Sequence, residues 1–456
     1  MRIKICQYFK PISVSLSPNT QKDDVFLAWK MILQIIFRKT DPVPEQARYG
    51  ASAKQKRKTD AETLEEKFKE YLGVKYAFSF NSGRSALMAI LYALEIPEKC
   101  QATNSADRLN LSPMLKKENE KGEKDEILIQ AFTCNAVPNS ILWSGANPVY
   151  VDIDETLNID PEDLEKKIAS KSKAIILQHT FGRPAQMEKI LTLAECYNLK
   201  VIEDCAHSLG AKFKGRKVGT LGDIAFFSFG RDKVISSVYG GMVATNNPDL
   251  AEKIKEFQEK CPYPSRFWIF QQLLHPIIFS IALPTYYFLN FGKFLIWFCQ
   301  KLRLLSKAVT KAEKQGKNPG YFPRRMPNAL ACLALNQLKK LDKFNEHRKE
   351  IAAFYDKNIK FGIKTEKESI FLKFSIFIDN QKEIFKKAKK NHILLNDGWW
   401  GSPVMPPDTD LEKMGYKAGS CPKAEKIAKT IINLPTHINI RQREAKKIIK
   451  CIESRK

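Results

Sequence analysis

Residues 76–94 read YAFSFNSGRSALMAILYAL, and this stretch decides the fold class. Its first five residues, rich in aromatic side chains, predict a strand, and the apolar run at 86–94 predicts the helix that follows. The small residues between them would present free backbone N–H groups at a helix N-terminus, where donors and helix dipole together stabilise an anion such as phosphate. A Ser-Gly turn before a helix is by itself usually only a turn, so this interpretation depends on what the rest of the chain supplies.

Two further motifs follow predicted strands. The apolar residues 199–203 lead to Asp204, and residues 224–229 lead to Lys233. Open α/β sheets hold ligands at the carboxyl ends of their strands. Taken singly, Asp204 is also consistent with an ordinary strand-end carboxylate, and Lys233 with one of many solvated lysines. Together the motifs supply a phosphate cradle that includes Ser228, a carboxylate for a pyridine nitrogen and a Schiff-base lysine, which predicts pyridoxal 5′-phosphate as the cofactor.

These motifs lie within longer collinear stretches that resemble the DegT/StrS group of pyridoxal-phosphate sugar aminotransferases. The resemblance covers about residues 60–260 and 320–450, and its further matches are at 126–136, 145–152, 179–182, 240–246, 325–331 and 434–437. It implies an α/β fold: an aspartate-aminotransferase-like large domain with a mixed, mostly parallel sheet, and a smaller C-terminal α/β domain.

The resemblance also implies roles for single residues. Lys233 would be the Schiff-base lysine and the proton shuttle between two half-reactions. Asp204 would be the partner of the pyridine nitrogen, and His207 would lie against the ring face. The other cofactor contacts that it implies are Gly83, Arg84, Ser85, Phe132 and Ser228.

Two positions depart from the family pattern. Cys134 stands where members usually carry an aromatic residue, which leaves Phe132 or His207 to cover the ring. In the neighbourhood of Arg324, before Arg325, members commonly have an asparagine that reaches the phosphate across a dimer interface. An arginine there is consistent with a charge-assisted replacement and equally with a solvent-facing charge.

The reaction that the resemblance implies is transamination in two halves. An amino-acid donor, expected to be glutamate, gives its amino group to the cofactor, and a nucleotide-linked keto sugar then receives it, for glycan or cell-surface polysaccharide synthesis. The candidate substrate-binding residues are Arg324, Arg325, Trp399 and Trp400, although an aromatic pair is more often packing. The alternatives are another pyridoxal-phosphate reaction such as dehydration, which the retained Lys233 disfavours, and a noncatalytic membrane-associated binding protein.

Length and composition frame these predictions. With 456 residues and 44% hydrophobic content, the chain can form more than one domain. We expect an N-terminal extension at 1–59, a cofactor-binding large domain at 60–260, a hydrophobic and basic insertion at 261–319 and a smaller domain at 320–456. In the last of these, residues 329–354 predict helix and 372–378 predict a strand.

Cysteine usage and charge narrow the environment and the partners. The ten cysteines and six histidines are scattered without metal-ligand spacing, which predicts no metal site and no disulfide framework. With no signal peptide recognised, we expect a cytoplasmic protein. The net charge of +25 calls for an anionic partner, such as a nucleotide diphosphate or anionic lipid. Nucleic acid is not indicated, because aromatic residues do not interleave the basic segments.

An apolar insertion stands apart from the family pattern. Residues 267–292 contain no charged side chain, a length that meets the criterion for a membrane span. A single crossing would separate the two parts of the enzyme, and Pro276 and Pro284 would interrupt a helix. We therefore expect a shallow hairpin or two interfacial helices on an anionic membrane surface, at its inner face. The alternative is a hydrophobic cover packed on the enzyme or on the partner subunit of a homodimer.

Two other segments complete the predictions for the chain. Residues 26–37 form an amphipathic candidate that would join either of those two surfaces. A polar insertion at 99–124 predicts a surface loop, to which we assign no function.

Overall fold

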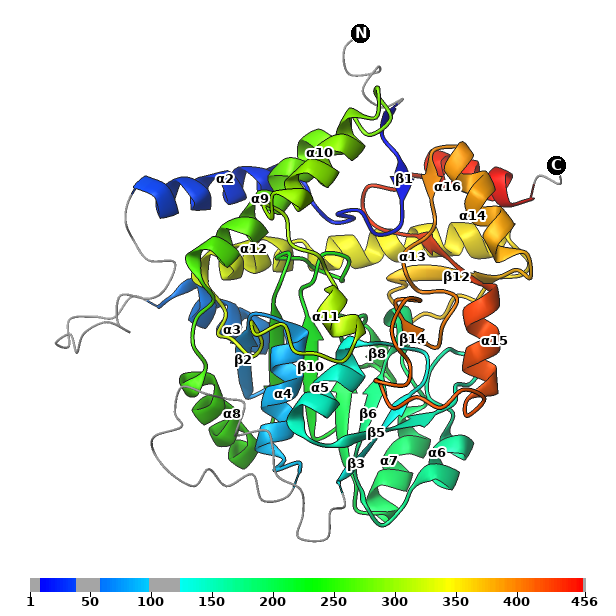
Figure 1. The fold of residues 1–456 in the computed structure, drawn as a ribbon. Helices are drawn as coiled ribbons and strands as arrows, with labels where there is room; N and C mark the ends of the chain where they lie inside the picture. Colours follow the sequence, from blue (N-terminus) through cyan, green and yellow to red (C-terminus); the bar gives the residue numbers. More distant parts are fainter. Residues whose placement is uncertain (1–8, 38–57, 98–123, 454–456) are drawn as a thin grey trace.

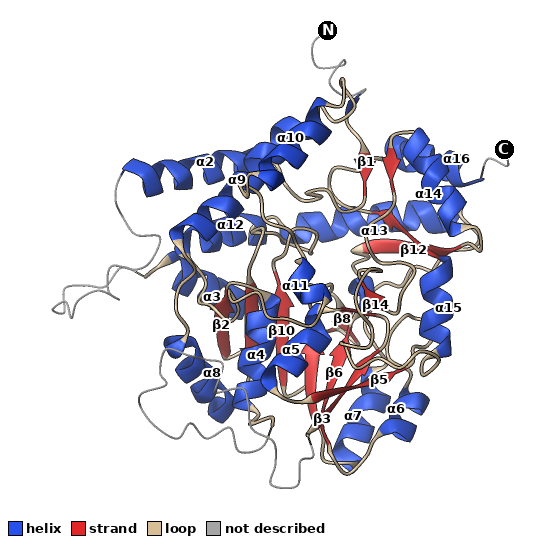
Figure 2. Ribbon diagram, viewed as in Figure 1, coloured by secondary structure: helices blue, strands red, loops and turns tan. Residues whose placement is uncertain are grey.

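The computed structural model describes residues 9–37, 58–97 and 124–453. Figures 1 and 2 show a central sheet with helices on both sides and a second, smaller group of strands and helices beside it. The polar insertion at 99–124, apart from its last residue, lies outside the described residues.

The central sheet has seven strands in the order β2-β11-β10-β7-β6-β3-β5. Only β11 runs antiparallel to its two neighbours, and the other pairs are parallel. The prediction of a mixed, mostly parallel sheet is therefore confirmed. The strands are β2 (Tyr76–Phe80), β3 (Glu126–Gln130), β5 (Asn147–Val151), β6 (Ser172–Gln178), β7 (Lys200–Asp204), β10 (Ile224–Ser228) and β11 (Gly241–Thr245).

Both faces of the sheet are buried. In β10, Ile224 and Phe226 point into one core cluster, while Ala225 and Phe227 point into another. This alternation follows from the two-residue period of a strand. The helices that cover the sheet are α3 (Asp60–Leu72), α4 (Gly83–Ala93), α5 (Ala136–Ser144), α6 (Pro161–Lys167), α7 (Met187–Cys196) and α8 (Pro248–Lys260).

The C-terminal part is built on an antiparallel pair, β12 (Lys373–Phe377) and β15 (Ile431–Pro435). The predicted helix at 329–354 is two helices, α12 (Asn328–Leu338) and α13 (Leu341–Asn358), and the predicted strand at 372–378 is β12. The remaining helices here are α14 (Gln381–Lys390), α15 (Pro422–Thr430) and α16 (Gln442–Glu453).

Short strand pairs tie distant segments of the chain together. β4 (Thr133–Cys134) pairs with β14 (Val404–Met405), and β1 (Ile12–Ser13) pairs with β13 (Ile393–Leu394). A two-residue hairpin pair, β8 (Lys212–Phe213) with β9 (Arg216–Lys217), and a 3-10 turn, η3 (Thr180–Gly182), complete the elements of the sheet region. β1 belongs to the N-terminal extension but pairs with β13 in the C-terminal part. The domain boundaries expected from the sequence stay a prediction.

The N-terminal extension and the insertion contribute helices of their own. The extension forms α2 (Lys22–Phe37), and the insertion forms α9 (Arg266–Ala282), α10 (Phe291–Lys301) and the short α11 (Lys311–Lys314). The expectation of an interruption at Pro276 is wrong, because α9 continues through it. An interior proline removes one backbone hydrogen bond and crowds the carbonyl four residues earlier, and burial of the α9 side chains on both sides of Pro276 opposes that cost. The helix ends before Pro284, as expected.

No helix in the described ranges combines the length and the apolar character needed to cross a bilayer.

Candidate active site

The predicted phosphate cradle forms where α4 begins. Ser82 caps the helix, and its side chain accepts a hydrogen bond from the backbone N–H of Ser85 at 3.1 Å. Gly83 lies against the end of β10: a Cβ at this position would be 3.1 Å from the Cβ of Ser228. The helix N-terminus and the strand-end serine, 145 positions apart in sequence numbering, are therefore adjacent.

Asp204 ends β7 and is buried. Burial raises the pKa of its carboxyl group to about 6, against the opposing effects of the Ala206 N–H, which donates at 3.0 Å, and of the Lys233 cation. A cation close to a buried carboxylate stabilises its ionised form and lowers its pKa.

Lys233 and His207 are in direct contact. Nζ of Lys233 lies 2.9 Å from Nε2 of His207, and 4.0 Å from the carboxylate of Asp232. Burial, the Lys233 cation and the Lys373 cation hold the pKa of His207 well below its usual value. The imidazole is therefore neutral at physiological pH, and its Nε2 can accept a hydrogen bond from Nζ of Lys233.

Aromatic rings surround His207. Phe181 stacks on it with ring centroids 5.4 Å apart, and Trp399 meets it edge-on at 5.0 Å. Phe132 is fully buried and contacts both Phe181 and Trp399. Of the two candidates for covering a cofactor ring, His207 contacts Lys233, whereas Phe132 contacts Phe181 and Trp399.

The structure adds charged residues that the sequence reasoning missed. Lys373 of β12 is buried and forms a 2.8 Å ion pair with the buried Asp397, and its Nζ is 3.9 Å from Asp232. The same ammonium lies 5.2 Å from the Phe181 ring centroid. The one signal in the sequence was a lysine within the otherwise apolar run at 370–374, because a charge there must find a buried partner.

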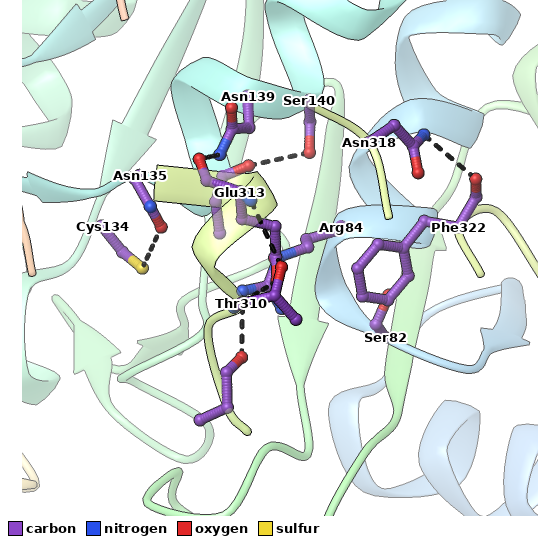
Figure 3. A network of polar contacts seen from close by, with 12 residues as sticks. Ser82, Arg84, Cys134, Asn135, Asn139, Ser140, Thr310, Glu313, Asn318 and Phe322 are labelled. Atoms are coloured by element: carbon purple, nitrogen blue, oxygen red, sulfur yellow. Dashed lines mark hydrogen bonds and ion pairs between the residues drawn. The ribbon is translucent and has the colours of Figure 1, made fainter. Parts of the chain in front are cut away.

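Arg84 makes a different contact from the one expected. Its Nε lies 2.7 Å from Oε1 of the fully buried Glu313, and its guanidinium packs over the Phe322 ring. Figure 3 shows Glu313 between Arg84 and Thr310, whose backbone and side chain both donate to Oε2 of Glu313. The Arg84 guanidinium therefore contacts α11 and the residues just before it.

Of the other two predicted arginines, Arg324 has a backbone contact with the cradle, whereas Arg325 pairs through its backbone with Phe80 and directs its side chain to another ring. The backbone N–H of Arg324 is 3.4 Å from Oγ of Ser85, while its guanidinium donates to the carbonyls of Gly320 and Pro323. The guanidinium of Arg325 lies over the Tyr263 ring.

The two tryptophans also separate. Trp399 is 5% exposed and belongs to the aromatic cluster. Trp400 donates to Asn396 and packs against Phe385 of α14. A substrate-binding role for Arg325 and Trp400 stays a prediction, without support from these contacts.

One buried group has metal-ligand chemistry. His179, Glu203 and Cys205 offer ligand atoms within 4.8 Å of one another. Glu203, however, already accepts hydrogen bonds from His179 and from the backbone N–H groups of Gly219, Leu221 and Gly222. We therefore assign the group a structural role next to Asp204.

A sequence profile of the DegT/DnrJ/EryC1/StrS aminotransferase family matches residues 51–268 and 295–453. The chain belongs to this family. The interval between the two matched ranges, residues 269–294, contains most of α9 and the start of α10, while residues 261–268 and 295–319 of the expected insertion lie inside the matched ranges.

Relatives and solved structures agree with the family match. The chain is 31% identical over 382 residues to GDP-perosamine synthase of Escherichia coli O157:H7, covering 82% of this chain and 84% of the relative. It is 27% identical to dTDP-3-amino-3,6-dideoxy-alpha-D-galactopyranose transaminase of Aneurinibacillus thermoaerophilus, covering 86% and 89%. The fold is similar to that of Helicobacter pylori PseC, an aminotransferase, with a TM-score of 0.66, 22% identity and coverage of 97% and 98%.

As a member of the DegT family, the protein is an aminotransferase that uses pyridoxal phosphate. Its residues fit that cofactor: a capped helix N-terminus faces Ser228, and a buried carboxylate and a lysine lie at the ends of the adjacent strands. In addition, Nδ1 of His207 is buried without a hydrogen-bond partner among the described residues. A ligand bound at the site would give this nitrogen a hydrogen-bond partner.

Proposed function

We propose that this DegT-family enzyme transfers an amino group from an amino acid, with glutamate as the expected donor, to a nucleotide-linked keto sugar. The product would serve glycan or cell-surface polysaccharide synthesis. The observation that carries the proposal is the contact between Lys233 and His207 beside Asp204, next to a helix N-terminus that can hold a phosphate. The names of the relatives, a GDP-perosamine synthase and a dTDP-sugar transaminase, support the substrate class.

Each site residue has a proposed task. Bound pyridoxal phosphate supplies an electron sink that stabilises negative charge on the substrate carbon. Lys233 would hold the cofactor through Nζ, and as a free amine it would move the proton at the substrate carbon. Neutral His207 accepts from Nζ of Lys233 and so sets the direction in which that amine points.

Asp204 would face the pyridine nitrogen. With its pKa raised to about 6 by burial, the carboxyl group is poised to ionise fully once a cationic partner is beside it. The backbone N–H groups of Gly83 to Ser85, with the Ser85 and Ser228 hydroxyls, would hold the phosphate.

Arg84 and Arg324 would contribute differently from the family pattern. The Arg84 side chain is paired with Glu313, so we propose that its backbone N–H serves the phosphate while its guanidinium fixes the α11 segment over the cradle. Arg324, whose backbone reaches Ser85, would shape the wall of the cradle. Trp399 would form the wall of the pocket on the substrate side, and Phe132 would pack against Trp399.

We propose that the enzyme is a homodimer in the cytoplasm, held peripherally at the inner face of a membrane. The dimer follows from the family resemblance, in which a partner residue completes the phosphate site. The peripheral placement is supported by an apolar surface outside the active site, on α2 and α10.

A spectrum of the purified protein tests the reaction. Protein reconstituted with pyridoxal phosphate should absorb visible light, and glutamate should bleach that absorption. Adding a nucleotide-linked keto sugar should restore it and yield an amino sugar, detected by mass spectrometry. A product that has lost water without gaining nitrogen would favour dehydration, and a colourless protein that cannot be reconstituted would contradict both reactions.

A further inference from the structure

An extended apolar surface lies outside the active site. On α2 the exposed side chains Phe26, Trp29 and Phe37 share one face, and on α10 Phe294, Trp297 and Phe298 are exposed. Phe26 is 73% exposed and Trp297 54%, so these rings are not covered by the chain itself. We call these two stripes the apolar face. Large apolar side chains left exposed on two helices that both pack on α9 make a candidate interaction site.

The apolar face belongs to one end of the molecule. Helix α9 packs into the protein through Trp268, Ile269 and Leu273, which are buried, and it contacts both α2 and α10. Figure 1 shows α2, α9 and α10 gathered at the same end of the ribbon. The alternative of a hydrophobic cover is therefore true of α9, whereas α10 turns its aromatic residues outward.

The segment of the chain around α9 and α10 is basic in sequence. Residues 261–312 contain no aspartate or glutamate, and they carry six basic residues: Arg266, Lys293, Lys301, Arg303, Lys307 and Lys311. The two acids at the start of α2 point the other way, since Asp23 and Asp24 are paired with Lys340 of the α12–α13 turn. The charge beside the apolar face is therefore positive.

The basic groups accompany aromatic rings. Nζ of Lys301 lies 5.1 Å from the Trp297 ring centroid, and Nζ of Lys293 lies 4.4 Å from that of Tyr287. Helices that lie in a membrane interface combine inserted aromatic and aliphatic side chains with lysine and arginine at the headgroup level.

We infer that the apolar face docks on a bilayer that contains anionic phospholipid, with α2 and α10 parallel to the membrane plane. This inference deepens the peripheral placement proposed above. A second copy of the chain is a poorer occupant, because a symmetric contact would bring the basic groups of both copies together without acidic partners. An anionic headgroup layer satisfies the basic residues and the aromatic rings at once.

Vesicle co-sedimentation tests the inference. We expect the full-length holoenzyme to bind vesicles of phosphatidylcholine mixed with phosphatidylglycerol, and to bind vesicles of phosphatidylcholine alone more weakly. The double variant Phe294→Ser/Trp297→Ser should bind at least about tenfold more weakly. The double variant Lys301→Gln/Arg303→Gln should lose its preference for anionic vesicles, by about fivefold for each charge removed. High salt should release the wild type only in part, because apolar burial is not screened.

Matched controls carry the same change elsewhere. Tyr197→Ser and Phe361→Ser remove rings that are 45% and 41% exposed but lie outside the apolar face, so vesicle binding should stay as in the wild type. All variants should keep the circular dichroism spectrum and the cofactor absorption of the wild type. Because vesicle binding needs neither substrate nor turnover, its outcome is independent of whether the proposed reaction is right.

Two outcomes would overturn the inference. One is a wild-type holoenzyme that ignores phosphatidylglycerol vesicles. The other is light scattering that shows an oligomer which Phe294→Ser/Trp297→Ser splits, with no vesicle binding by the wild type. The second result would assign the apolar face to a second copy of the chain.

Discussion

Nζ of Lys233 and Nε2 of His207 are 2.9 Å apart, although the residues stand on separate loops after β10 and β7. Burial and the cations of Lys233 and Lys373 keep the His207 imidazole neutral. It therefore accepts a hydrogen bond from the Lys233 amine and places no second positive charge beside it. Lys233 is in this way held by His207 beside the buried Asp204.

Lys233→Ala should abolish both the covalent attachment of pyridoxal phosphate and turnover. The reason is that Nζ of Lys233 is the amine in contact with His207 at the site. Borohydride reduction followed by peptide mass spectrometry checks the attachment, with Lys255→Ala on the exposed face of α8 as the control. A normal reducible linkage in Lys233→Ala would reject the assignment.

Asp204→Asn should keep the fold and some cofactor binding but slow transamination by about one to two decades. An amide cannot sustain the positive charge of a pyridinium, and a lost charge-assisted contact is worth roughly 1.5–3 kcal/mol. Turnover at saturating cofactor measures the effect. A rate near that of the wild type would count against the proposed role.

Asp204 should also leave a mark on the pH dependence of stability in the cofactor-free protein. Its folded pKa of about 6 lies above the usual value of 3.8, so its favourable contribution is complete below pH 4 and is lost as the pH rises through 6. Relative to Asp204→Asn, the wild type should lose about 2 kcal/mol of unfolding free energy between pH 4 and 7. Urea titrations at both pH values check this; equal pH dependence of the two proteins would refute it.

Glu313→Gln should destabilise the protein, because it leaves the Arg84 guanidinium buried without its charge partner. Breaking such a pair from one side is worth about 3–5 kcal/mol, so we expect a loss of this order in urea unfolding. The double variant Arg84→Met/Glu313→Gln should lose less than the sum of the two single variants, because no lone charge remains. Additive losses would show that the two side chains do not interact.

Trp399→Ala and Trp400→Ala form a matched pair of adjacent tryptophans. Trp399 contacts His207, Phe132 and Phe181, so its loss should weaken substrate use strongly, measured as kcat/KM. Trp400 packs on Phe385, and its loss should leave kcat/KM close to the wild-type value. The reverse order of effects would place the substrate on the other side of this loop.

Local sequence patterns were sufficient for the sheet and for the centre of the site. Strand β2 and helix α4 form where residues 76–94 predict them, since apolar periodicity and a capping serine act over a few residues. Asp204 ends β7 and Lys233 follows β10. Because these two strands are parallel neighbours, their carboxyl ends lie at one edge of the sheet, so the proximity of the two residues could be expected from the sequence.

Other features depend on partners that sequence order does not indicate. Arg84 is adjacent to the predicted cradle, yet its guanidinium pairs with Glu313, more than two hundred residues later. Lys373 is neutralised by Asp397, and the neighbours Trp399 and Trp400 face different surroundings. A buried charge takes whichever partner the packed chain brings within reach, and that choice is made by the tertiary structure.

The insertion shows the same division. The sequence by itself determined that residues 267–292 lack charge and that this segment and residues 26–37 carry apolar faces. Only the tertiary structure decided that one face of α9 is buried and that α9 is continuous through Pro276, and that α10 is left with exposed aromatic rings. The physical reason is that apolar composition sets how much free energy the burial of these side chains can release. Packing geometry decides which of the side chains are buried.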